Sequence, residues 1–145
     1  MEYAEYHPGR LILGNLPHGQ DLFDSIAALC RAASVETGVF SVAGVVSSYT
    51  IGAYDPRQQV YVTVHETAPR EIASCSGSVT LRDGETDISA HIVLADDQGG
   101  VTGGALFPET RILAGEVRLR EWTGPPPTRE YDAATGRMRW RFHRG

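Results

Sequence analysis

Residues 89–106 carry the side chains whose types and spacing most directly suggest chemistry. The segment begins as an apolar run that contains His91 and continues into an acidic, glycine-rich stretch. Its glycines are Gly99, Gly100, Gly103 and Gly104. An imidazole beside such a turn can serve as a metal ligand or a general base. The competing interpretation, a buried and hydrogen-bonded strand histidine, is favoured because a ligand histidine needs partners.

Three residues on other predicted strands could supply those partners. His65 alternates with valines, a pattern that predicts an exposed position. Glu71 opens an otherwise uncharged strand, where a structural ion pair is favoured over catalysis. Cys75 has no histidine beside it in the sequence, so a small buried strand residue is favoured over a nucleophile. The sequence does not show whether these groups converge on His91.

The two glycine pairs could also form a phosphate-binding loop. Both the dinucleotide fingerprint and the P-loop need a helix directly after the glycines. Here Phe107, Pro108 and Glu109 lead into a strand instead. We therefore expect Gly103 and Gly104 to allow a tight turn and a close approach at a subunit contact.

The composition limits the class of protein. The chain has 145 residues, 41% hydrophobic and 21% charged, which suits one folded domain. Its net charge of −5 argues against a domain that clamps nucleic acid, because that binding depends on clustered Lys and Arg. There is neither an apolar run of about 18 residues nor a secretory signal, so we expect a cytoplasmic protein without a membrane partner. In that compartment Cys30 and Cys75 would be buried, reduced thiols.

The hydrophobic pattern predicts one helix followed by many strands. The helix would begin at Asp21, which can cap it, and Gly38 would end it. Strands are predicted over residues 10–16, 39–46, 48–54, 60–65, 71–81, 87–94 and 110–122, with a bend near Gly44, Ser47 and Ser48 and an Asp-Gly hairpin turn at 82–85. The last strand would be the closing edge of the sheet, with Ile112 on the face of Arg118 and Arg120. This order predicts an α+β fold, a mainly antiparallel β-sheet with one principal helix packed on it.

The predicted domain spans residues 10–123, after a lead-in of residues 1–9. Residues 124–145 follow a proline run as a C-terminal extension. Within it Met138, Trp140 and Phe142 alternate with arginines, which predicts an edge strand. The five arginines of the extension could touch nucleic acid, but no Arg-Gly-Arg core flanked by prolines is present.

Eight short motifs occur in an order that resembles the plants-and-prokaryotes-conserved (PPC) domain. They are GQDL at 19–22, GVFSVAG at 38–44, IGAYD at 51–55, EI at 71–72, SGSV at 76–79, HIVLAD at 91–96, GG at 103–104 and EV at 116–117. The resemblance covers roughly residues 10–122. It implies a PPC-like α+β fold assembled as a homotrimer, in which Glu71 could pair with Arg10 or Arg111. Plant members carry AT-hook DNA-binding motifs, which this stand-alone chain lacks.

The resemblance also implies where a metal would bind. Some stand-alone members carry His-x-His in the strand and a third histidine directly after the glycine pair. Only His91 matches that pattern here, because Ser89 and Ala105 stand at the other two positions. Zinc needs three or four donors within about 2.0–2.3 Å, so we expect a degenerate site and no cofactor. A zinc site stays the alternative if His65, Cys75 or Glu71 completes the set.

These observations favour a non-enzymatic homotrimeric assembly or regulatory module, associated with DNA through a partner. The alternative is a metal-dependent or small-molecule-binding protein, and in that case an enzyme. Its site would lie at subunit interfaces, around His91, His65, Glu71, Gly103 and Gly104. Direct DNA binding is a third hypothesis.

Overall fold

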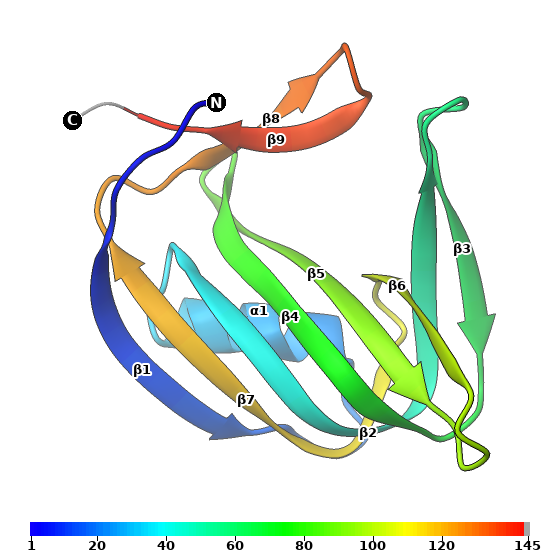
Figure 1. Ribbon diagram of the computed structural model, residues 1–145. Helices are drawn as coiled ribbons and strands as arrows, with labels where there is room; N and C mark the ends of the chain where they lie inside the picture. Colours follow the sequence, from blue (N-terminus) through cyan, green and yellow to red (C-terminus); the bar gives the residue numbers. More distant parts are fainter. Residues whose placement is uncertain (144–145) are drawn as a thin grey trace.

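The computed structural model describes residues 1–143, so Arg144 of the predicted extension lies outside the described residues. Within this range the chain forms one helix and nine strands. In chain order they are β1 (His7–Asn15), α1 (Leu22–Ala32), β2 (Gly38–Asp55), β3 (Val60–Glu66), β4 (Arg70–Arg82), β5 (Glu85–Ala95), β6 (Val101–Leu106), β7 (Arg111–Thr123), β8 (Thr128–Asp132) and β9 (Arg137–Arg141). Figure 1 shows α1 lying across one face of the sheet. The predicted α+β fold is confirmed.

The centre of the sheet closes on itself. The first half of β2 pairs with β4, and its second half pairs with β6 through Ile51 and Gly52. Since β4, β5 and β6 are neighbours, the strands β2, β4, β5 and β6 form a closed path. The strands β7 and β1 continue the sheet beyond the first half of β2. All of these pairings are antiparallel, as predicted.

The long strand β2 belongs to both ends of this path because it bends near its middle. Gly44 has a φ of 145°, in the region that favours glycine, and the register with β4 shifts between Ser41 and Gly44. Further irregularities against β7 occur between Val45 and Ser48. The sequence placed the bend correctly but divided β2 into two strands. Beyond the bend, β2 and β3 form a hairpin that projects from the sheet (Figure 1).

The helix begins where it was predicted and ends earlier. The Asp21 carboxylate accepts a hydrogen bond from the Asp24 amide at 2.9 Å, the usual geometry of an N-cap. Its other oxygen accepts from the Thr110 amide at 2.9 Å, which ties the start of α1 to the segment before β7. The prediction that Gly38 ends the helix is wrong. The helix ends at Ala32, Ser34 takes a φ of 55°, and Gly38 opens β2.

Strand β7 corrects two further predictions. It lies between β1 and β2, so β1 rather than β7 forms this edge of the sheet. Ile112 is buried with Val117 and Leu119, not on the face of the arginines. The register with β2 skips Leu113, and this extra residue reverses the alternation of faces along the strand.

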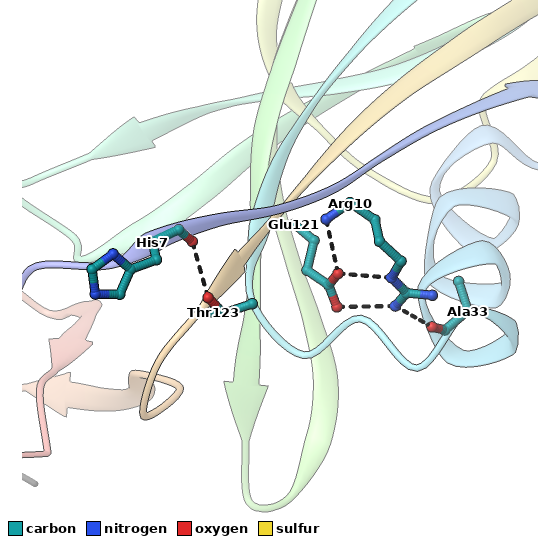
Figure 2. Close-up of polar contacts among 5 residues, drawn as sticks. All are labelled: His7, Arg10, Ala33, Glu121 and Thr123. Atoms are coloured by element: carbon teal, nitrogen blue, oxygen red, sulfur yellow. Dashed lines mark hydrogen bonds and ion pairs between the residues drawn. The ribbon is translucent and has the colours of Figure 1, made fainter.

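An ion pair joins β1 to β7 and to the end of the helix (Figure 2). The Arg10 guanidinium donates to both carboxylate oxygens of Glu121, at 2.8 and 2.9 Å, and to the Ala33 carbonyl oxygen at 2.7 Å. The Arg10 amide also donates to Glu121, at 3.1 Å. These hydrogen bonds lower the pKa of Glu121 to about 2.

The C-terminal extension contains the predicted edge strand as β9 and pairs it with an additional strand, β8, in a hairpin. Strands β8 and β9 pair along their length, and β8 meets β4 only at Thr128 and Leu81, in parallel. The half-buried Arg129 fixes this hairpin to the sheet, since it donates to Ser78 at 3.1 Å and lies 3.7 Å from the Asp87 carboxylate. Its guanidinium also lies 5.3 Å from the centre of the Trp140 ring.

The core lies between α1 and the sheet and includes both cysteines as free thiols, as predicted. Burial raises the pKa of Cys30 and of Cys75 to about 11, which keeps both thiols protonated near neutral pH. Among residues 1–143, no helix is long and apolar enough to cross a membrane.

Candidate functional site on the open face

The sheet face opposite α1 carries two rows of side chains that run across five strands. Directly paired residues in antiparallel strands place their side chains on the same face. The first row is Leu11, Arg120, Val39, Ser78 and Ser89. The second row is Leu13, Arg118, Ser41, Ser76 and His91. We call these ten residues the open face.

The open face is hollowed into a groove of about 730 Å³, which all ten of its residues line. Leu11 and Leu13 form one rim on β1, and Ser89 and His91 form the other on β5. Serine hydroxyls lie between the rims. A concave surface of this size is in the range of small-molecule sites.

Of the three positions that the family resemblance assigns to metal ligands, Ser89 and His91 lie on the open face and the buried Ala105 lies beside His91. His91 is paired with Ala105 of β6, and Ser89 precedes it by two residues on the same face. Of these three side chains only the His91 imidazole is a common zinc donor. No group of three or more His, Cys, Asp or Glu side chains suited to hold a metal occurs among residues 1–143. Within residues 1–143 of one chain, these side chains therefore do not supply a set of ligands that fits a zinc ion.

The other predicted site residues are dispersed. His65 lies on β3, where its Nδ1 atom is 2.7 Å from the Thr50 hydroxyl oxygen. Strands β2 and β6 lie between β3 and the strand of His91, β5. Strand spacing alone puts these two histidines roughly 14 Å apart. Cys75 is paired with the buried Ile92, so its side chain lies on the opposite face from His91. Glu71 is exposed at the start of β4, where it is paired with Ala95 at the end of β5.

The expected ion pairs of Glu71 do not form within one chain. Arg10 binds Glu121, and Arg111 donates to the Gly19 carbonyl oxygen at 3.1 Å.

Gly103 and Gly104 lie inside β6 and not in the turn, where Gly99 has the positive φ, 82°. A Cβ on Gly103 would lie 2.8 Å from the Ile92 carbonyl oxygen, and one on Gly104 would lie 2.6 Å from that of Gly52. Real Cβ atoms do not come this close to a backbone oxygen. The two glycines therefore allow β6 to fit between β5 and β2 within one chain.

Sequence reasoning did not propose Arg118, Arg120, Ser41, Ser76 or Ser78 as site residues. Arg118 and Arg120 are exposed, and no ion pair to either one occurs among the described residues. The usable signal was the alternation of Ser76, Ser78 and Arg118, Arg120 with buried residues. Alternation along one strand shows which residues share a face, but only the pairing register shows which residues of the neighbouring strands lie beside them.

The hairpin of residues 49–66, which we call the β3 arm, is the second unusual surface. Every residue of β3 is exposed, including Val60, Val62 and Val64, at 46%, 57% and 55%. These alternate valines form a stripe on one side of the arm. Strand β3 pairs only with β2 among the described residues, so its other edge is free.

A closed antiparallel sheet with one covering helix, an open face and a projecting arm defines a class of small α+β proteins. The model of the Plants and Prokaryotes Conserved domain matches residues 3–123 of this chain. The chain belongs to this family, which is the PPC family of the sequence resemblance.

Solved structures support the assignment. A metal-containing protein from Archaeoglobus fulgidus is 32% identical, with a TM-score of 0.93 over 98% of this chain and 100% of that one. A PPC protein from Pyrococcus horikoshii is 26% identical, with a TM-score of 0.91 over 99% of each chain. A candidate DNA-binding protein from Bacteroides thetaiotaomicron shares the fold at 16% identity, with a TM-score of 0.86 over 96% of this chain and 99% of that one. A comparison with curated proteins gave no match.

Proposed function

We propose that this protein is a non-enzymatic, homotrimeric assembly module of the cytoplasm that reaches DNA through a partner protein. The observation that carries the proposal is the exposed valine stripe of the β3 arm. A projecting hairpin with an apolar stripe and a free edge would promote aggregation if nothing covered it. A second copy of the chain is the occupant that is always present.

A second apolar patch fits this role. Val93 and Val101 are exposed on the β5–β6 hairpin, at 39% and 69%. They lie on the same face, because Val93 pairs with Gly103 and Val101 with Ala95. Contact between two different patches of identical chains is head-to-tail, and it gives a closed ring when the rotation between neighbouring copies closes. That the ring contains three copies is taken from the family resemblance, which implies a homotrimer.

The distribution of reactive groups supports a non-enzymatic role. The two thiols are buried with raised pKa, and His91, His65 and Glu71 lie on separate parts of the sheet. General acid–base and nucleophilic catalysis both need such groups within hydrogen-bond reach of one another.

The arginines of the extension support an indirect link to DNA. Arg139 and Arg141 lie 3.0 and 3.6 Å from the Glu130 carboxylate. Arg129 lies against Asp87, and Arg137 stacks 5.2 Å from the centre of the Tyr54 ring. These charges are engaged within their own chain, whose net charge is −5. Similar structures from Bacteroides thetaiotaomicron and Ralstonia eutropha are described as candidate DNA-binding proteins. This description is the reason for proposing a partner protein that binds DNA.

Light scattering tests the assembly. We expect a trimer for the wild-type chain and a monomer for Val62→Glu, because a charge in the stripe would have to be buried. Thr63→Glu is the matched control: it adds the same charge to the other side of the same strand and should leave the mass unchanged. A monomeric wild-type protein, or equal dissociation by both variants, would contradict the proposal.

A duplex DNA titration tests the indirect link. We expect no binding by the purified chain at about 150 mM salt, where direct phosphate contacts would still be measurable. Binding that weakens steeply with added salt would instead establish direct contact.

The metal-dependent alternative is not favoured, because only one of the three matched ligand positions holds a zinc donor. The metal-containing relative from Archaeoglobus fulgidus makes the measurement worthwhile. Stoichiometric zinc in the purified protein, lost in His91→Ala, would restore this alternative.

A further inference from the structure

The open face has a surplus of positive charge. Its two rows contain two arginines and a histidine and no carboxylate. Along these strands, the nearest acidic residues at alternating positions are Glu116, two residues before Arg118, and Asp87, two residues before Ser89. Glu121 directly follows Arg120 and is already bound by Arg10 at 2.8 Å. Asp87 is already bound by Arg82 at 2.6 Å and by Arg129 at 3.7 Å. Glu116 is therefore the one of these carboxylates without an ion pair among the described residues, and it alone remains to offset the positive charge of Arg118 and Arg120.

Arg118 and Arg120 differ from the arginines that form ion pairs within this chain. Arg10, Arg82 and Arg139 each bind a carboxylate. By contrast, the described residues offer no carboxylate within 4.0 Å of Arg118 or Arg120. Two residues apart on one strand, they place two guanidinium forks on one surface, about 7 Å apart at their Cα atoms. A guanidinium pairs with carboxylate or phosphate oxygens through two parallel hydrogen bonds.

The residues beside the arginines can bind the rest of an anion. Ser41 is paired directly with Arg118, and Ser76 comes next in the same row. Hydroxyls can donate to anionic oxygens that the arginines do not reach. Leu11 and Leu13, beside Arg120 and Arg118, are 62% and 70% exposed and offer an apolar surface.

We propose that the open face binds a small organic molecule that carries two anionic oxygen groups, of the phosphate-ester or dicarboxylate class. Arg118 and Arg120 hold the two charges, the serines donate to the remaining oxygens, and Leu11 and Leu13 cover the carbon part. The groove of about 730 Å³ suits a molecule of this size. This inference goes beyond the assembly role and does not depend on it.

Calorimetric titration of the full chain tests the site, with inorganic pyrophosphate and succinate as the two probes. At about 150 mM NaCl we expect saturable binding of at least one probe, with a dissociation constant near or below about 1 mM. The probe that binds more tightly identifies the phosphate or the dicarboxylate class.

The variants separate specific contacts from general charge. The double variant Arg118→Ala, Arg120→Ala should weaken binding by at least about tenfold, since charged hydrogen bonds are lost. The double lysine variant keeps both charges and should weaken binding less, because it lacks only the paired geometry. Arg57→Ala removes one exposed arginine from the turn after β2 and should leave binding unchanged.

The proposal is overturned if neither probe binds saturably, or if the alanine double variant binds as the wild-type chain does. Equal weakening in Arg57→Ala would also overturn it, since net charge alone would then explain binding. Circular dichroism establishes that each variant is folded. Light scattering of the same samples reports the assembly separately, so that a failed site and a failed trimer give different results.

Discussion

The helix-covered face and the open face of this sheet come from the same strands, and their side chains serve different purposes. Along β5, Ile88, Ala90, Ile92 and Leu94 are buried, while Ser89, His91 and Val93 between them are exposed. The covered face is apolar and closely packed, and the open face is polar, cationic and concave. One alternating pattern therefore specifies both the core and a candidate binding surface, and substitutions on the two faces should have different consequences.

The largest expected difference separates two leucines. Leu119→Ala removes a fully buried side chain and should lower the free energy of unfolding by about 2–5 kcal/mol. Leu13→Ala removes a side chain that is 70% exposed and should change it by less than about 0.5 kcal/mol. Denaturant unfolding of both variants measures the two values. Comparable losses would mean that the open face is covered.

The next effect concerns the closed path that supports both faces. Gly104→Ala would place a Cβ 2.6 Å from the Gly52 carbonyl oxygen and should cost about 1–3 kcal/mol of stability. Gly14→Ala is the control, because its nearest contact would be an ordinary 3.4 Å from Val117. Thermal unfolding should show a lower midpoint for Gly104→Ala only. A neutral Gly104→Ala would show that β6 can move away from β2.

A smaller effect is expected where the helix attaches to the covered face. Asp21→Ala removes the N-cap acceptor and the bond to the Thr110 amide, at a cost of about 1–2 kcal/mol. Asp21→Asn retains one acceptor oxygen, so its free energy of unfolding should fall by less than that of Asp21→Ala. Chemical denaturation compares the three proteins, and equal stability of all of them would contradict the capping role.

The smallest effect is the pH dependence of the ion pair between Arg10 and Glu121. Because folding lowers the Glu121 pKa from 4.5 to about 2, its stabilising effect is complete above about 4.5 and is lost as the pH falls toward 2. Glu121→Gln should therefore lower the midpoint temperature at pH 7 by on the order of 2 °C. The difference from wild type should disappear near pH 2. A difference that persists unchanged there would assign the effect to packing.

Much of the fold could be predicted because it depends on local patterns. Helical spacing after Asp21 gave the start of α1, and alternation gave most strands and the hairpin of residues 89–106. The errors arose where neighbours in space decided the outcome. Gly38 is needed where β2 lies against β7, and the extra residue Leu113 reverses the faces of β7. Neither contact is visible within a window of sequence.

The sequence by itself determined the family, the two buried thiols and the absence of histidines at positions 89 and 105, since each follows from which residue stands where. Only the tertiary structure decided what surrounds His91. Pairing across five strands brings Ser76, Ser41 and Arg118 into its row and keeps His65 and Cys75 away from it. Strand register joins residues that are distant in the chain, and local propensity does not contain it.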